Sequence, residues 1–407
     1  MRRTTFNDTQ VATSETARGI NRGIVLNLIR RRQPISRADL ARASGLQRST
    51  VSLITEQLIR ERWVIYGSIG RLPRGRRPTF LQLNDQRAIL AIDLRPAVTT
   101  LAVSDVNGRF LSQQRVQTPT DPNIAAKTFS EKLQQMIANH PNLVFEGIGI
   151  SVPGRFDEHR QRVLFAPNLN WPEFDLRAPL EDATGLQVEM ENAANACVLA
   201  EVWFGRAERP RNLLVITVSE GLGVGIFCDG RLLRGANGMA GEYGHVSLDP
   251  SGPRCGCGAR GCWEVYASNW AALRYYRATA GSDGPSFQDL LALAEGGDKL
   301  ALKSLDHMAH EIGRGMRMIV ATLAPEEIVF VGEFTKLWDR LGPLIETDVA
   351  SSVLIGKPPL VRPAAAEPSV ARLRGTVALV LQKHFGPVIP AERQPRPARM
   401  QVEAQLQ

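Results

Sequence analysis

The sequence contains no run of about 18 uncharged apolar residues, the length that a membrane-spanning helix requires. Its first residues, Met1 to Asp8, lead into no apolar segment, so a secretory signal is missing as well. These two absences predict a cytoplasmic protein without a membrane partner. Hydrophobic residues make up 43% and charged residues 22% of the 407 residues. That composition excludes a wholly disordered or collagen-like chain, and at about 100–200 residues per domain the length predicts two to four domains.

Cysteine is used sparingly: the chain has five, at positions 197, 228, 255, 257 and 262. An odd number, with three of them between 255 and 262, does not fit a disulfide framework and indicates a metal site in a cytosolic protein. With His245, residues Cys255, Cys257 and Cys262 supply one nitrogen and three sulfurs, the ligand set of a closed structural zinc site. The alternative is that they are reduced thiols of a core. The cysteines at 197 and 228 are predicted to be ordinary core residues.

Lysine is absent from residues 1–83, which hold 16 arginines and five acidic residues, a balance of +11. Because the whole chain carries +8, residues 84–407 carry −3. A strongly basic segment on a mildly acidic body indicates a module that binds a polyanion. The alternative is a basic surface that is only solvated.

Local patterns between residues 21 and 84 predict three helices and a hairpin. The first helix starts at Gly23 and ends before Pro34, because proline cannot continue a helix. Ser36 can cap a second helix that Gly45 ends, and a third follows at about 47–62. Residues 63–66 and 79–83 predict two strands around a loop rich in Gly and Arg. This order predicts a winged helix-turn-helix domain over residues 21–84, after a flexible N-terminus of residues 1–20.

In such a domain the third helix enters the major groove of double-stranded DNA, and the wing reaches phosphates or the minor groove. The contacts expected from the helix are Gln47, Arg48, Ser49, Thr50 and Ser52. Those expected from the wing are Arg71, Arg74, Arg76 and Arg77. Since some winged helices contact proteins instead, a protein contact is the alternative.

Residues 85–386 predict an α/β body of two related lobes with a cleft between them. Strands are expected at 88–94, 98–103 and 110–116, then a helix near 123–140 and a strand at 145–150. A similar unit opens at Asn212 with strands at 213–218, 224–228 and 231–233, and later has a helix near 298–323 and a strand at 328–331. Residues 387–407, rich in Pro, Arg and Gln, are predicted to be a disordered tail.

Three motifs of the body are specific in their order of residues. They are Gly-Ile-Ser-Val-Pro-Gly at 149–154, Ala-Gly-Glu-Tyr-Gly-His at 240–245 and Cys-Gly-Cys-Gly-Ala-Arg-Gly-Cys-Trp-Glu at 255–264. In these motifs the chain resembles the ROK family (repressors, open reading frames and sugar kinases), over about residues 20–385. The resemblance implies an actin-like, two-lobed sugar-kinase body behind a repressor-type head. It also implies that a loop over 245–262 holds zinc.

The phosphate-binding turns that the resemblance implies are altered in this sequence. Where kinases of the family read Asp-Ile-Gly-Gly-Thr, residues 93–97 are Asp-Leu-Arg-Pro-Ala, so both glycines are lost and the proline has no N–H to donate. In the second turn, residues 219–223, Glu220 places a carboxylate beside the phosphates. The adenosine turn becomes Gly-Glu-Phe at 332–334, and Ala193 replaces the catalytic aspartate, so general-base help is gone. These changes predict a protein that is not an enzyme.

The same resemblance implies sugar contacts from Asn192, Glu242, His245 and Glu264, whose amide, carboxylate and imidazole groups suit hydroxyls. Glu242 and Glu264 can equally orient the zinc ligands. The leading hypothesis is a sugar-responsive transcription factor, a repressor of carbohydrate genes, that binds its operator as a homodimer or homotetramer. The zinc loop is then a candidate link between sugar and head. The alternatives are an active sugar kinase with a DNA-binding head and a regulator controlled by a protein partner.

Overall fold

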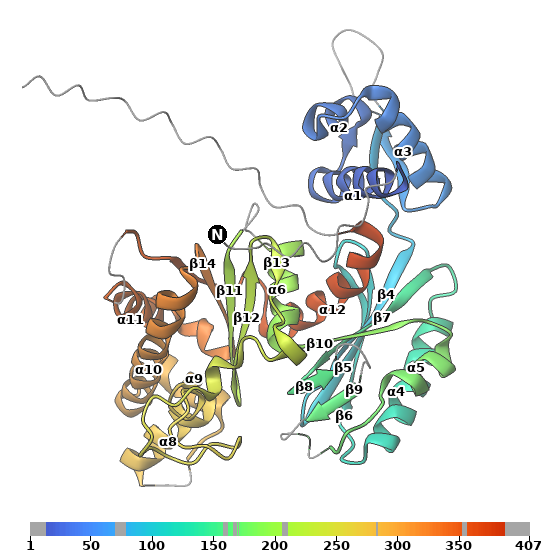
Figure 1. Cartoon of the computed structure of the whole chain (residues 1–407). Coiled ribbons are helices and arrows are strands. Elements are labelled where there is room, and N and C mark those ends of the chain that lie inside the picture. The colour runs from blue at the N-terminus through green and yellow to red at the C-terminus, as the bar shows by residue number, and fades with distance from the viewer. Residues whose placement is uncertain are drawn as a thin grey trace, which may run out of the picture.

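The computed structural model describes residues 14–69, 79–157, 162–165, 169, 171–205, 211–281, 284–351 and 356–386. Figure 1 shows a small N-terminal unit next to a larger body that is built on two sheets. We call residues 14–69 and 79–83 the head.

The head contains three helices and an antiparallel sheet of strand order β1-β3-β2. Its elements are α1 (Ser14–Arg32), β1 (Ile35–Ser36), α2 (Arg37–Ser44), α3 (Arg48–Arg60), β2 (Val64–Ile69) and β3 (Thr79–Leu83). The helices and the hairpin expected from the sequence are therefore present, and the short strand β1 is an addition. Ser36 caps α2 by accepting the N–H of Asp39 at 3.2 Å, and Gly45 ends it with a φ of 71°.

The flexible segment predicted for residues 1–20 overlaps α1, which begins at Ser14. Residues 14–20 therefore have a helix where the sequence predicted no regular element. Glu, Ala and Arg in this stretch favour a helix, but residues 17–20 are exposed and so leave no apolar pattern to detect.

The first sheet of the body has the strand order β10-β7-β4-β5-β6. Its strands are β4 (Arg87–Asp93), β5 (Val98–Asp105), β6 (Phe110–Gln117), β7 (Val144–Val152) and β10 (Val188–Asn192). Helices α4 (Pro122–Ala138) and α5 (Arg177–Thr184) share a buried core with it, while β8 (Arg155–Asp157) and β9 (Arg162–Phe165) form a separate hairpin. The expected order of three strands, a helix and a strand is confirmed.

The second sheet has the order β13-β12-β11-β14-β15. Its strands are β11 (Leu213–Val218), β12 (Leu222–Cys228), β13 (Arg231–Leu232), β14 (Glu327–Val331) and β15 (Leu360–Pro363). The helices packed with it are α8 (Asn269–Ala280), α9 (Phe287–Glu295), α10 (Lys299–Leu323) and α11 (Trp338–Ala350). Cys197 is buried as expected, but Cys228 is exposed, so its prediction as a core residue is wrong. Cys228 is the last residue of β12, where the chain turns sharply into β13.

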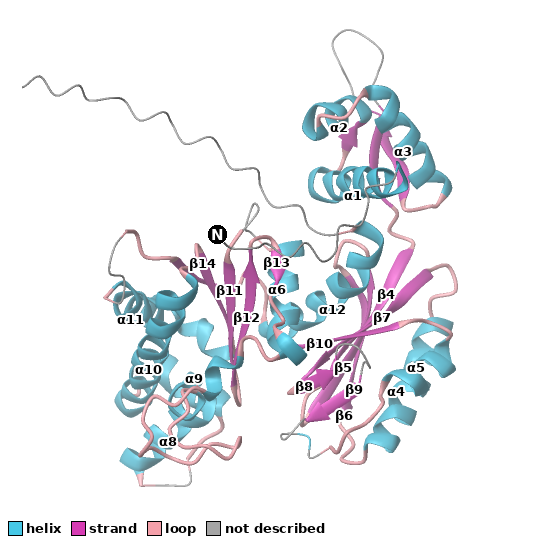
Figure 2. Cartoon of the chain, in the orientation of Figure 1, coloured by secondary structure: helices cyan, strands magenta, loops and turns pink. Residues whose placement is uncertain are grey.

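Two helices, α6 (Ala193–Phe204) and α12 (Pro368–Phe385), lie between the sheets (Figures 1 and 2). They contact each other so closely that a Cβ at Gly375 would lie 1.9 Å from the carbonyl oxygen of Ala196. One buried cluster contains Val198 of α6, Val377 of α12, Ala91 of the first sheet and Val215 of the second. The two helices are therefore the common layer on which both sheets pack.

The same cluster continues into the head through the C-terminal end of α12. The ring of Phe385 lies 5.6 Å from Trp63 of the head and 5.3 Å from Trp203 of α6, both edge to face. Arg22 Nη1 donates to the carbonyl of His384 at 2.7 Å, and Asn27 Nδ2 donates to that of Phe385 at 3.1 Å. These donors satisfy carbonyls that the end of a helix leaves unpaired. The head therefore docks on the end of α12.

None of the described helices is both long enough and apolar enough to cross a membrane.

We predict that Gly375→Ala destabilises the body by about 1–3 kcal/mol, because the new methyl group meets backbone that cannot rotate away. Gly19→Ala is the matched control, since Gly19 is also inside a helix but a Cβ there meets nothing within 4 Å. That control should gain about 0.5–1 kcal/mol. Urea unfolding followed by circular dichroism measures both changes, and equal effects of the two variants would contradict the close packing of α12 on α6.

Candidate functional site

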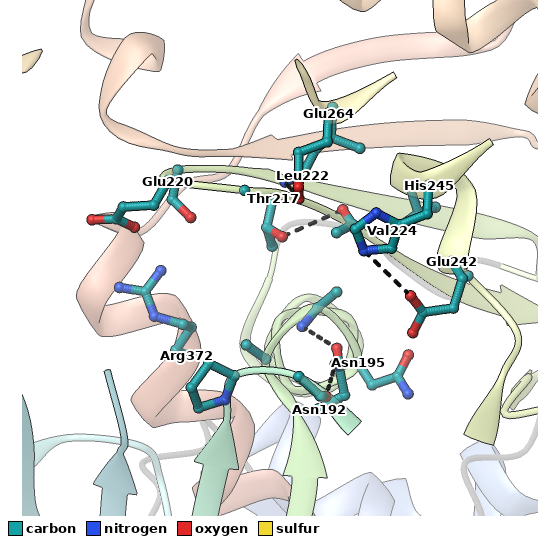
Figure 3. A pocket seen from close by; sticks show the side chains of 18 of the residues that line it. Asn192, Asn195, Thr217, Glu220, Leu222, Val224, Glu242, His245, Glu264 and Arg372 are labelled. Carbon is teal, nitrogen blue, oxygen red and sulfur yellow. Dashed lines mark hydrogen bonds and ion pairs between the residues drawn. The ribbon is translucent and has the colours of Figure 1, made fainter. Parts of the chain in front are cut away.

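A cavity of about 330 Å³ opens between the two sheets at the start of α6 (Figure 3). Its volume is within the range of small-molecule pockets. From the first sheet it is lined by the ends of β4, β7 and β10, and from the second by the β11–β12 turn. The sugar contacts implied by the sequence, Asn192, Glu242, His245 and Glu264, all line this one cavity. The fold thus brings them together from three separate segments, since Glu242 and His245 belong to one short helix.

The predicted metal ligands also converge. One ligand atom from each of His245, Cys255, Cys257 and Cys262 lies within 4.8 Å of all the others. His245 Nδ1 is 3.6 Å from Cys255 Sγ, and the sulfurs of Cys257 and Cys262 are 3.7 Å apart. Tetrahedral zinc, with bonds of about 2.0–2.3 Å, places nitrogen and sulfur about 3.6 Å apart and two sulfurs about 3.8 Å apart. The four residues therefore fit a metal ion of this kind.

Two acidic side chains connect the cavity with this cluster. Glu242 Oε2 is 3.9 Å from His245 Nε2, the ring nitrogen on the side away from Cys255. Glu264 Oε1 is 3.7 Å from Cys255 Sγ, and its Oε2 accepts the N–H of Leu222 in the β11–β12 turn at 3.0 Å. Glu242 thus lies on the side of His245 from which a carboxylate can orient a metal-bound imidazole, although 3.9 Å is longer than a hydrogen bond. Both carboxylates also line the cavity. The positions of Glu242 and Glu264 are therefore compatible with both roles that the sequence left open, contact with a sugar and support of the metal ligands.

Asn192 has a structural role that the sequence did not reveal. Its Oδ1 caps α6 by accepting the N–H of Ala194 at 2.8 Å, and its Nδ2 donates to the carbonyl of Gly154 at 2.8 Å. These bonds fix the amide at the wall of the cavity and leave one N–H and one lone pair for a ligand.

The sequence alone also did not reveal that Glu191, the residue before Asn192, is a buried carboxylate with several partners. Glu191, 1% exposed, accepts the Asn192 N–H at 2.9 Å, the side-chain amide of Asn195 at 3.0 Å and Arg234 Nη2 at 2.8 Å. Burial raises the pKa of Glu191, and Arg234 offsets part of that effect. Because Arg234 follows β13, this ion pair joins the second sheet to the first. Its only signal in the sequence is the run Glu-Asn-Ala-Ala-Asn at 191–195.

The turns at residues 93–97 and 219–223 take part in two internal ion pairs. Arg372 of α12 donates through Nε to both oxygens of Asp93, at 2.9 and 3.1 Å, and both residues are buried. Burial alone would lower the pKa of Arg372, but the Asp93 carboxylate outweighs it and raises that pKa. Arg95 Nη2 is 3.2 Å from both oxygens of Glu220, across the cleft. Burial opposes ionisation of Glu220, yet Arg95 overcomes it and lowers the pKa.

The motifs and fold agree with a comparison to protein families, in which the model described as "ROK family" matches residues 89–383. The chain belongs to the ROK family. It is 32% identical over 347 residues to the xylose repressor of Bacillus subtilis (strain 168), covering 84% of this chain and 90% of that protein. The sequence-based assignment to this family is thereby confirmed.

Solved ROK structures include both regulators and kinases. A ROK family transcriptional regulator, a homolog of the E. coli MLC protein, superposes with a TM-score of 0.76 at 28% identity, covering 91% of this chain and 99% of that chain. A ROK family glucokinase from Streptomyces griseus, in complex with glucose and AMPPNP, superposes with a TM-score of 0.65 at 30% identity, covering 72% of this chain and 99% of that chain. Both support the actin-like, kinase-type body, and the regulator shares more of the chain.

The head, which precedes the matched ROK residues, presents part of the predicted DNA surface. Gln47, Arg48 and Ser49 at the start of α3 are exposed, and Thr50 and Ser52 are half-buried. The wing residues Arg71, Arg74, Arg76 and Arg77 lie outside the described residues.

We predict about one zinc ion per chain in protein purified without chelator. Cys257→Ser should lose most of that zinc and unfold at a lower temperature, because a structural metal contributes folding free energy. Cys228→Ser is the matched control, an exposed cysteine outside the cluster. Metal analysis and thermal unfolding measure both effects. Equal zinc content in the two variants would contradict the assignment of these ligands.

Proposed function

We propose that the protein is a transcriptional repressor of carbohydrate genes, in which a sugar binds a kinase-like body that no longer transfers phosphate. The observation that carries this proposal is the pairing of a basic three-helix head with a ROK body whose phosphate turns hold internal ion pairs, Asp93–Arg372 and Arg95–Glu220. The names of two relatives, a xylose repressor and a ROK transcriptional regulator, support it.

We assign residues 21–84 as a winged helix-turn-helix domain, with residues 85–386 as the effector and oligomerisation domain. Helix α3 has one buried face, with Val51, Ile54 and Leu58, and an opposite face that is open to solvent. A helix of this kind fits the major groove. Because operators of such proteins mirror a two-fold axis, the proposed assembly is a homodimer or homotetramer.

We propose a sugar as the effector because the cavity combines amides and carboxylates on rigid supports. Asn192 is fixed by the cap of α6, and Glu242 and Glu264 lie against the metal cluster. Zinc in that cluster would supply structural rigidity to the wall of the second sheet. The loop over 245–262 would then hold the carboxylates of Glu242 and Glu264, which flank it, at fixed positions for the hydroxyl groups of a sugar.

Phosphoryl transfer is not part of the proposal. Ala193 offers no general base. Arg372 already neutralises Asp93, and the Arg95–Glu220 pair lies where the two turns approach each other. A nucleotide would have to break both pairs before its phosphates could enter.

A path from the cavity to the head is provided by α12. Arg372, near the start of α12, lies in the cavity wall, and His384 and Phe385 at its other end contact the head. At 1.5 Å per residue, Arg372 and His384 are about 18 Å apart along the helix. We propose α12 as the coupling element, in preference to the zinc loop. A sugar that favours one separation of the lobes would move α12 and with it the docking surface of the head.

For DNA binding, we predict that Arg48→Ala weakens binding to sequences selected from a random duplex pool by about 1–3 kcal/mol, because a base or phosphate contact is lost. Thr50→Ala should act in the same direction. Arg76→Ala should weaken binding to every duplex and reduce the salt slope by about one. Arg277→Ala, an exposed arginine of α8 in the body, is the control and should change neither. Fluorescence anisotropy measures the affinities, and failure of the wild type to bind any duplex at low salt would remove the DNA assignment.

For the sugar, we predict that D-xylose, D-glucose or N-acetylglucosamine raises the melting temperature of the zinc-loaded protein. At a sugar concentration of one hundred times Kd, the free energy of unfolding should increase by about 2.7 kcal/mol. Glu242→Gln should reduce the shift, whereas Glu295→Gln, an exposed glutamate of α9, should not.

No ATP should be consumed with any of these sugars, even in Ala193→Asp, because Arg372 and Arg95 still occupy the phosphate turns. No shift with any sugar would favour a protein partner, and ATP consumption would favour a kinase.

A further inference from the structure

An apolar side chain stands on the surface of the head where polar contacts to DNA are expected. Leu53 is 68% exposed, although it is in the middle of α3. At 100° per residue it shares the outward face of the helix with the exposed Ser49 and Gln57, one turn before and one turn after it, and this face is opposite the buried Val51 and Leu58. Figure 1 shows α3 at the edge of the head.

Leu53 contributes little to the core of the head. Helix α3 packs inward through Val51, Ile54 and Leu58, which are at most 9% exposed. Tyr66, another exposed large residue of the head, has a hydroxyl that accepts from Arg37 Nη2 at 3.2 Å. A leucine has no polar atom to use in this way. Towards the N-terminus of α3, where the predicted DNA contacts lie, its neighbour on this face is the short side chain of Ser49.

If α3 lies in the major groove of DNA, the chemistry of that groove limits the contacts that an apolar side chain can make. Along the base edges of the major groove every base offers hydrogen-bond donors or acceptors, and the 5-methyl group of thymine is the one apolar feature. An apolar side chain in that groove gains affinity by covering this methyl group and loses affinity over polar edges, which it would leave unpaired.

We propose that Leu53 determines specificity by contacting the C5 methyl group of a thymine in each half-site. The proposal rests on the proposed function, because it requires α3 to lie in the major groove. The expected gain is that of one buried methyl group, about fourfold in affinity. Leu53 therefore adds an apolar contact to the polar set of Gln47, Arg48, Ser49, Thr50 and Ser52.

The test uses the full chain and a chemical change of one methyl group in the DNA. Duplexes enriched by the wild type from a random pool are sequenced, and each thymine in turn is replaced by deoxyuridine, which lacks only that methyl group. The wild type should lose about fourfold in affinity at one thymine per half-site and much less at the others. Leu53→Ala should bind the thymine duplex more weakly and no longer distinguish it from the deoxyuridine duplex.

Two variants serve as controls. Ile20→Ala removes an exposed apolar side chain of the same head, 55% exposed on α1, and should keep the full preference for thymine. Leu53→Met retains an apolar tip and should keep most of the preference for thymine. The preference is a ratio of two affinities, so a small change in folding of a variant cancels.

The outcomes separate this proposal from the one on which it rests. If sequences are enriched but Leu53→Ala still prefers thymine to deoxyuridine as the wild type does, the role of Leu53 is wrong and DNA binding stands. If deoxyuridine has no effect at any position, the methyl contact is wrong as well, and Leu53 would then fit a protein contact. If the wild type enriches no sequence, both proposals fail.

Discussion

Helix α12 lies against α6 with so little space that a side chain at Gly375 would meet the backbone of Ala196. Both sheets pack on this pair of helices, and the head docks on its end through Trp63, Phe385 and Trp203. In a close-packed interior such a contact has discrete arrangements and does not deform gradually. A change in the angle between the sheets therefore requires a shift of packed surfaces, either of α12 against α6 or of a sheet against these helices.

The Asp93–Arg372 pair gives α12 an electrostatic attachment inside the cleft. Two buried charges are costly to separate, because a charge left without its partner keeps its desolvation penalty. The pair also decides what the turn at residues 93–97 contacts, because Asp93 at its start binds a helix of its own chain.

Sequence patterns predicted the parts of this protein that depend on neighbouring residues. Strand β11 and the cap of α2 at Ser36 follow from local apolar runs and capping chemistry, and the metal ligands follow from close spacing around Cys257. Contacts between distant segments were not predictable. Arg372 is 279 residues from Asp93, and Arg95 is 125 residues from Glu220. Each arginine looks like an ordinary charged residue of its own segment, and only the fold shows its partner.

The cleft has two rigid walls and a small number of bonds between them. Glu264 and the metal cluster support one wall, and Glu191 with the cap of α6 supports the other. Arg95–Glu220 and Arg234–Glu191 join the walls. A sugar seated between them can change the balance of lobe arrangements only by the difference in its affinity for each. By the same linkage DNA on the head must change the affinity for the sugar by an equal factor, so in the proposed regulator α12 has to transmit free energy in both directions.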